Sequence, residues 1–363
     1  MKHSLLSVPA LVLCCASQAH AQWSENFDTY GANTPVVGQG GWTEWSVGAG
    51  ANVSNTVALS PANSIDIAGP TDLVHDYAGY TSGKWVYRAM QYVPSTMVGQ
   101  SYFILLNTYL APAGPYNWSV QVKFDAAAGL VSADAGASTP ATHPLLTDQW
   151  VEIKVFIDLD EDWCQFYYDG DLLDVSTLAD HPTLGGGYRW TGGVFGGGSG
   201  LAEIQAVDLY ANNATSVYYD DISLQPFVFE TVGKGCPGSM GNVTVTMQLP
   251  PTLGGVFLAQ IDNLPLGACF NVIGLSRATS SFGPLPLDLG SFGMPTCTMY
   301  TSIDAANFMV SNPSQPNSVV FAVPIPNDPF YIGFEMHQQV LSLDTAANAA
   351  GAVTSDAMSI KIQ

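Results

Sequence analysis

The sequence predicts an all-β protein, in which a jelly-roll β-sandwich is followed by a smaller β-sandwich. Short segments of alternating apolar and polar residues recur between turns rich in glycine, proline and asparagine, a pattern typical of antiparallel sheets. Before residue 225 no long apolar pattern has the helical period, which disfavours a helical fold. The 36 glycines and 23 prolines among 363 residues are the composition of a turn-rich β protein.

Residues 149–174, QWVEIKVFIDLDEDWCQFYYDGDLLD, predict two neighbouring strands and the turn between them. In residues 150–158 valines and isoleucines alternate with other residues, so they share one face of a strand. A polar turn leads into an aromatic strand at 163–168, which ends at a second hairpin signal, Asp169-Gly170. The residues of the first strand expected in the core are Val151, Ile153, Val155 and Ile157.

The same alternation predicts the other strands of the first sandwich. In the segment WSVQVKF, the apolar side chains from Trp118 to Phe124 are expected on one face, and Ser119, Gln121 and Lys123 on the other. The further strands are expected at 23–30, 84–93, 102–110, 117–124, 203–210 and 217–224.

Residues 1–21 predict a secretory signal peptide. Lys2 precedes an apolar stretch, and Ala19-His20-Ala21 has the small residues of a cleavage site. We therefore expect a secreted protein, extracellular or at the cell surface, that begins near Gln22. No later apolar run is long enough to cross a bilayer.

The charge balance limits the partners. Thirty acidic residues face nine basic ones, which gives a formal net charge of -21. Such a chain repels nucleic acids and anionic membrane surfaces, so neither is expected to bind.

The length and a change in composition predict two domains. A chain of 363 residues can bury two separate cores, and the composition changes near residue 225. We expect the jelly roll at 22–226, a linker at 227–234 and the smaller sandwich at 235–363.

Four cysteines remain after the signal peptide, and an even number in an exported protein favours disulfides. We favour a bond between Cys236 and Cys297, which would close a loop of about sixty residues and stabilise the fold by about 4 kcal/mol. Cys164 and Cys269 either pair with each other or stay as buried thiols.

Three segments of the first sandwich carry a resemblance: ENFD at its start, QWVEIKVFIDLDEDWCQFYYDG in its middle and AVDLYANNATSVYYDDISL at its end. Over residues 22–226 the chain resembles the concanavalin A-like lectin/glucanase superfamily, specifically its LamG-like jelly rolls. This resemblance implies a two-sheet jelly roll whose concave face binds sugars. The segments GCPGS, LPLDL, PTC and IPNDP are similar to a recurrent C-terminal module of secreted bacterial proteins, which suggests attachment, sorting or display.

In a strand, odd- and even-numbered residues point to opposite faces, a relation we call parity. Parity indicates which residues lie on the faces opposite the core, and these are candidates for ligand binding. Sugar recognition needs hydrogen-bonding groups for hydroxyls and an aromatic ring for the apolar face of the sugar, and Trp150 and Tyr109 could supply the ring. The alternative is an ordinary solvated sheet face. The candidates are Asn107, Tyr109, Gln121, Lys123, Trp150, Lys154, Gln165 and Tyr210.

A catalytic alternative needs two carboxylates across a cleft. Parity permits Glu152 and Asp208 as that pair. The superfamily's glucanases have a Glu-x-Asp-x-x-Glu motif, and this chain lacks it, because Gln205 stands where the central acid belongs. We therefore assign no catalytic residue.

A structural calcium site is a further possibility. Glu25 shares parity with Trp23 and Phe27, and Asp220 with Ile222, so both acids are expected to point toward the core, where unpaired carboxylates are costly. Calcium, water at the strand ends or a basic partner could compensate. The calcium ligands would be Glu25, Asp28, Asp220 and Asp221.

Together these observations favour a secreted protein that binds a polysaccharide or a cell-surface glycan. The alternatives are an extracellular polysaccharide hydrolase or lyase, and a structural or adhesive surface protein that binds no sugar.

Overall fold

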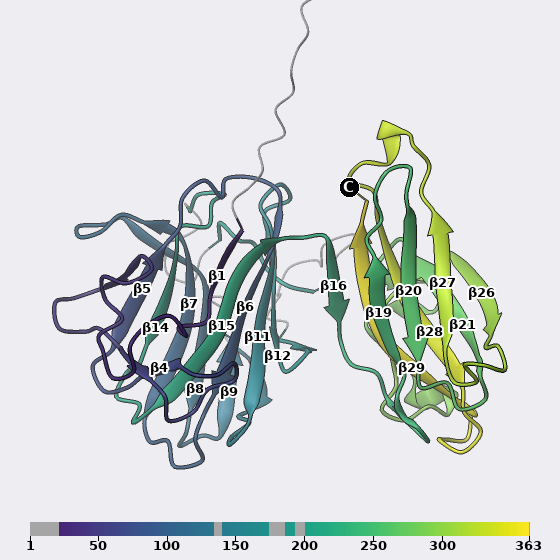
Figure 1. The fold of residues 1–363 in the computed structure, drawn as a ribbon, viewed down its shortest axis with the longest axis horizontal. Helices are drawn as coiled ribbons and strands as arrows, with labels where there is room; N and C mark the ends of the chain where they lie inside the picture. The colour runs from purple at the N-terminus through teal and green to yellow at the C-terminus, as the bar shows by residue number, and fades with distance from the viewer. Residues whose placement is uncertain (1–21, 134–139, 174–185, 193–199, 363) are drawn as a thin grey trace, which may run out of the picture.

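The computed structural model describes residues 22–133, 140–173, 186–192 and 200–362. The predicted signal peptide, residues 1–21, lies outside the described residues. Within them the protein is all-β, and the helical elements are the short 3-10 turns η1 (Gly290–Phe292) and η2 (Pro329–Tyr331). The predicted fold class, two consecutive β-sandwiches, is confirmed (Figure 1).

The first sandwich consists of two antiparallel sheets, which we call Sheet A and Sheet B. The predicted strand at 23–30 ends at Glu25, and the one at 203–210 begins at Ala206. Sheet A has the order β13 (Asp171–Leu172), β12 (Trp163–Tyr168), β11 (Trp150–Asp158), β6 (Lys84–Tyr92), β15 (Val217–Pro226), β4 (Ser64–Ile67), β3 (Asn52–Ser54), with β1 (Trp23–Glu25) on β15. Sheet B has the order β10 (Ala141–Pro144), β9 (Leu130–Ala133), β8 (Tyr116–Asp125), β7 (Gln100–Tyr109), β14 (Ala206–Tyr210), β5 (Asp72–Asp76), β2 (Trp42–Glu44).

Sheets A and B enclose one hydrophobic core between their inner faces. Strand β11 pairs without interruption with β6 on one side and β12 on the other, so its alternation is preserved along its whole length. The side chains predicted to be buried on β11 all belong to this core: Val151, Ile153, Val155 and Ile157.

Bulges interrupt the alternation at two places in this sandwich, in the β7–β8 pair, where both strands are irregular, and in β15. Between β7 and β8 the register passes from Leu105↔Val120 to Leu106↔Trp118, so Ser119 is left out of the pairing. A bulge of one residue moves the following side chains to the other face. Trp118 therefore leaves the core side and packs on the outer face of Sheet B. The prediction that it shares a face with Val120 is wrong.

The second bulge lies in β15, where the register shifts between Asp220 and Ser223. Asp221 has a φ of 44°, and the residues on both sides of the bulge, Tyr219 and Ile222, lie in the core. The alternation along the sequence predicted that Asp220 shares the inward face of Ile222. Because of the bulge it does not, and this prediction is wrong.

The second sandwich packs a five-stranded sheet against a three-stranded one. The segment expected to be a linker, 227–234, contains β16, which pairs with β29. The larger sheet has the order β16 (Phe229–Val232), β29 (Ala352–Lys361), β28 (Glu335–Leu343), β21 (Ala268–Gly274), β26 (Ala305–Val310). The smaller has the order β19 (Thr244–Leu249), β20 (Val256–Asp262), β27 (Val319–Pro324). Six two-residue strands of this sandwich form three two-stranded pairs: β17 (Pro237–Gly238) with β18 (Gly241–Asn242), β22 (Thr279–Ser280) with β23 (Gly283–Pro284), and β24 (Leu287–Asp288) with β25 (Thr298–Met299).

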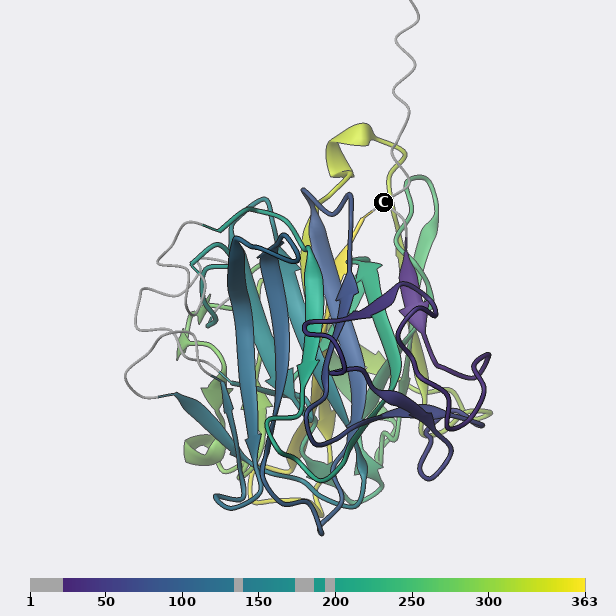
Figure 2. The same ribbon diagram turned by 90° about the vertical axis from the view of Figure 1, so that its left-hand side faces the viewer.

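The outer face of Sheet A packs against the second sandwich, whereas Sheet B lies on the far side of the molecule. Strand β16 runs between the two sandwiches in Figure 1, and the view in Figure 2 looks onto Sheet B. Phe156 of β11 meets Phe227 with 5.2 Å between ring centroids. The side chain of Lys154 bonds the Glu230 carboxylate at 3.0 Å and the Thr231 carbonyl at 2.6 Å.

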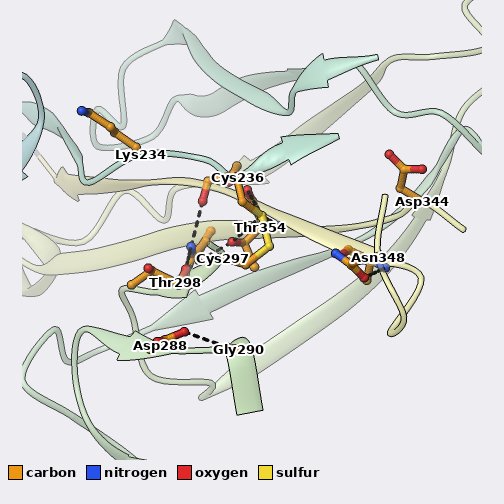
Figure 3. The surroundings of a disulfide bond; sticks show 12 residues. Lys234, Cys236, Asp288, Gly290, Cys297, Thr298, Asp344, Asn348 and Thr354 are labelled. Carbon is orange, nitrogen blue, oxygen red and sulfur yellow. Dashed lines mark hydrogen bonds between the residues drawn. A yellow bond between two sulfur atoms is a disulfide. The ribbon is translucent and has the colours of Figure 1, made fainter. Parts of the chain in front are cut away.

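The predicted disulfide between Cys236 and Cys297 is present and spans 61 residues of sequence. Thr354 of β29 lies against it, and its backbone N–H donates to the Cys236 sulfur (Figure 3). Cys164 and Cys269 are buried free thiols in different sandwiches, so the alternative in which they pair is wrong. No helix among the described residues is long and apolar enough to span a bilayer. A disulfide is compatible with an extracellular protein.

Candidate functional site

The outer face of Sheet B carries a cluster of four aromatic rings, of which Tyr109 is buried and the other three are partly exposed. We call this cluster the aromatic platform: Trp45, Tyr109, Tyr116 and Trp118. The ring of Trp45 lies 5.1 Å from Tyr109, 4.6 Å from Tyr116 and 5.9 Å from Trp118, measured between centroids, and it stacks on Trp118. Such a surface offers ring faces to a ligand.

Local structure explains why these four rings meet. Tyr109 and Tyr116 lie opposite each other at the ends of β7 and β8, and the bulge at Ser119 turns Trp118 to the same face. Trp45 comes from the distant end of β2, where its backbone N–H donates to the Asp72 carbonyl at 2.9 Å. The platform thus joins segments more than sixty residues apart in the sequence.

A pair of hydrogen-bonded carboxyl groups lies on the same face. Asp208 of β14 and Asp72 of β5 bond through their side chains, and Asp208 is only 4% exposed. Burial, and then the charge and hydrogen bond of Asp72, raise the pKa of Asp208 well above its ordinary value. Burial also raises the pKa of Asp72, and the charge of either carboxyl group opposes ionisation of the other. The Oδ1 atom of each is buried and has no hydrogen-bond partner within the described residues.

The platform and the carboxyl pair lie on the same outer face of Sheet B. Burial raises the pKa of the Tyr109 phenol, and the charges of Asp76, Asp208 and Asp72 add to this shift, so the phenol lies within their electrostatic field. Asp76, at the exposed end of β5, also has a raised pKa because of partial desolvation. The arrangement combines apolar ring faces with carboxylate acceptors.

Several predicted ligand-binding residues lie on this face. Ile104 of β7 pairs with Gln121 of β8 on one side and with Asp208 of β14 on the other. Lys123 and Tyr210 flank Tyr102, whose ring stacks on Tyr210 at 5.9 Å. These side chains extend the site along Sheet B, away from the platform.

Asn107 does not face the open side. It is fully buried, and its amide nitrogen donates to the Ser119 hydroxyl at 2.8 Å and the Trp190 carbonyl at 3.1 Å. The side chain therefore holds the two bulged strands and the Trp190 segment together.

The other predicted residues, Trp150, Lys154 and Gln165, lie on Sheet A, with the core between them and Sheet B. Lys154 and Gln165 are buried against the second sandwich, and the Trp150 ring lies 5.6 Å from that of Tyr92. The eight candidates therefore do not share one surface.

The two acids of the catalytic alternative, Glu152 and Asp208, do not lie together. Glu152 lies on the outer face of Sheet A, 3.4 Å from the Nε of Arg88. Asp208 lies on the outer face of Sheet B. The two carboxylates thus lie on different sheets with the core between them, and they do not form the pair that parity permitted.

Sequence reasoning missed Trp45, Asp72, Tyr116 and Trp118 as site residues. Asp72, Val74 and Asp76 alternate with buried residues along β5, and this alternation was a usable signal. No local signal places Trp45 beside Trp118, because their contact depends on the fold.

The predicted calcium ligands are bonded to protein donors instead. The Asp220 carboxylate accepts from the backbone N–H groups of Leu59, at 2.8 Å, and Asp221, at 2.8 Å. Burial nevertheless raises its pKa to about 6. Glu25 accepts from the Phe27 N–H at 2.8 Å and from the Tyr30 hydroxyl.

Asp28 accepts from the N–H of Asn63 at 2.9 Å, and Asp221 from the Ser60 hydroxyl at 3.0 Å. Across the described ranges no three histidine, cysteine or acidic side chains are grouped to hold a metal ion. These four acids are therefore satisfied without calcium, and the calcium site stays a prediction.

No protein-family model matches the chain, and no curated protein matches it. Among solved structures, a sialidase is similar with a TM-score of 0.38 at 10% identity, over 57% of this chain and 18% of the sialidase. The catalytic domain of a glycoside hydrolase family 131 protein from Coprinopsis cinerea has a TM-score of 0.34 at 12% identity, covering 56% of this chain and 94% of that one. A carbohydrate-binding module from Bacillus subtilis has a TM-score of 0.31 at 14% identity, over 51% and 95%. The chain thus spans about a fifth of the sialidase. Likenesses at this level carry no argument about function.

Proposed function

We propose that the chain is an exported glycan-binding protein whose ligand lies on the outer face of Sheet B. The observation that carries this proposal is the aromatic platform beside the Asp72–Asp208 pair. The C–H faces of a sugar ring pack against aromatic rings, while its hydroxyl groups bond donors and acceptors at the edge. The partly exposed Asp72 and the exposed Asp76 supply acceptors beside the rings.

The charge of the site favours neutral sugars. Asp72, Asp76 and Asp208 lie at the platform, and the whole chain carries a formal net charge of -21. A polyanionic glycan would be repelled from this face. The ligand class is therefore a neutral polysaccharide or a neutral cell-surface glycan.

A tryptophan comparison tests the proposal. Neutral and acidic glycans are screened on an array, and a bound neutral oligosaccharide is then titrated into the wild type and the variants Trp45→Ala, Trp118→Ala and Trp150→Ala. Loss of a stacking ring is expected to weaken binding at least about tenfold in the first two. Trp150→Ala is the matched control on Sheet A and should bind normally.

Two outcomes would contradict the proposal. If Trp150→Ala loses binding and Trp45→Ala keeps it, the site is on Sheet A. If a folded wild type binds no glycan at all, the protein is a structural or adhesive surface protein without a sugar ligand.

Hydrolysis of a polysaccharide is the second candidate, because burial raises the pKa of Asp208 on the face that carries the platform. A carboxyl group that keeps its proton beside an aromatic sugar platform can serve as a general acid. Release of reducing sugar from neutral polysaccharides, lost in Asp208→Asn and kept in Glu152→Gln, would support hydrolysis. Glycan binding without any such release leaves binding as the whole function.

A further inference from the structure

A second pocket lies between the two sandwiches, on the side of Sheet A away from the aromatic platform. Its volume is about 230 Å³, which matches a monosaccharide in size. Both sandwiches line it, the first with Gln165, Tyr167 and Asp171, the second with Arg277, Thr298 and Tyr300.

Arg277 is a buried cation whose hydrogen-bond partners among the described residues are all neutral groups. Its side chain is only 6% exposed. One Nη donates to the Gln165 Oε1 at 2.9 Å and the Tyr167 hydroxyl at 2.6 Å. The other Nη donates to the Ser359 hydroxyl at 3.5 Å. The Nε–H, which belongs to the same planar fork, has no partner within the described residues.

The neighbouring buried cations show what is absent at Arg277. Lys154 pairs with Glu230 at 3.0 Å, and Lys84 with Asp158 at 3.0 Å. None of the ion pairs in the described parts of the chain includes Arg277. A charge taken out of water without a counter-ion is costly.

The surroundings do not neutralise the guanidinium. The pKa of His337 is lowered to about 3, first by burial and then by the charges of Arg277 and Lys84, so this histidine is neutral. The acid that lines the pocket, Asp171, already contacts Lys234 at 3.2 Å and His143 at 3.2 Å.

We propose that this pocket binds a carboxylate-bearing ligand of monosaccharide size, such as a terminal uronic acid, with its carboxylate on the Nε–H side of Arg277. A planar carboxylate matches the guanidinium fork. The rings of Tyr167 and Tyr300 supply apolar walls, and Gln165 and the Thr298 segment supply polar groups. This site is separate from the aromatic platform and does not depend on the function proposed for it.

Calorimetric titration of the full mature chain with D-glucuronate tests the proposal, with D-glucose and the methyl ester of D-glucuronate as uncharged controls. The wild type should bind glucuronate at least about tenfold more tightly than either control, because each lacks the charge that Arg277 recognises. Equal affinities for the three sugars would overturn the proposal with the wild type alone.

Variants then locate the site. Arg277→Gln should weaken glucuronate binding at least about tenfold, whereas Arg189→Gln, which removes an exposed arginine paired with Asp162, should not change it. Undiminished binding by an Arg277→Gln protein that melts cooperatively would rule the pocket out. If that variant does not fold, the comparison of glucuronate with its methyl ester in the wild type decides. Loss of glucuronate binding in Trp45→Ala would assign the acid to the platform and overturn the proposal.

Discussion

The two outer faces of the first sandwich differ in what covers them. On Sheet A, Glu152, Lys154 and Gln165 alternate with core residues, as expected of a solvated polar face, yet the second sandwich buries two of these three. On Sheet B, Trp118 was expected in the core and instead lies partly exposed on the open face. Alternation thus indicates which side chains point away from the core. It does not indicate whether solvent or another domain covers them.

The covered face is built like the interior of a protein. Phe156 packs with Val86, Trp163 and Phe227 in a small apolar cluster. The Glu230 carboxylate lies between Arg88, at 2.6 Å, and Lys154, at 3.0 Å. Polar residues on such a face are matched to specific partners, whereas those on an open face remain available to a ligand.

Removing one aromatic ring from each face should give the largest difference in the free energy of unfolding. Phe156→Ala should lower the free energy of unfolding by about 3–5 kcal/mol, because it leaves a cavity between the sandwiches. Tyr116→Ala, on the platform, should cost about 1 kcal/mol or less. Denaturant unfolding of both variants measures the contrast, and similar losses would mean that Sheet A is not covered.

The buried ion pair should show the next largest effect. Glu230→Gln removes the charge that Arg88 and Lys154 share, and we expect a loss of about 3 kcal/mol, because two cations are left without a buried counter-ion. Glu161→Gln, at an exposed position, is the control and should change the free energy of unfolding by less than about 1 kcal/mol. A Glu230→Gln variant as stable as the wild type would indicate that water reaches this face.

The smallest effect concerns pH and Asp356 of β29. Burial raises the pKa of this carboxyl to about 6, although the charge of Lys154 opposes the shift. Between about pH 4 and 6 the folded state holds a proton that the unfolded state has released. The free energy of unfolding therefore falls as pH rises through this window.

Asp356→Asn removes that penalty. The variant should be more stable than the wild type at pH 7 by roughly 1–3 kcal/mol, and the difference should vanish near pH 4. Thermal or denaturant melts across this range measure it. A difference that does not change with pH would mean that Asp356 titrates normally and is solvated.

The strands that sequence reasoning predicted well are those that pair without interruption. Strand β11 keeps one register against both neighbours, so the period of two assigned its core residues correctly. In β8 and β15 a single bulged residue reversed the assignment for Trp118 and Asp220. A bulge depends on the pairing of two strands, and the alternation within one strand does not reveal it.

The sequence by itself determined the all-β class, the inward residues of the regular strands and the bond between Cys236 and Cys297, because these follow from local periodicity and from a small number of cysteines. Only the tertiary structure decided which outer face stays open and where the site lies. The contacts responsible, Trp45 with Trp118 and Lys154 with Glu230, join segments far apart along the chain. Their energies depend on burial and pairing in three dimensions, which no local pattern of residues encodes.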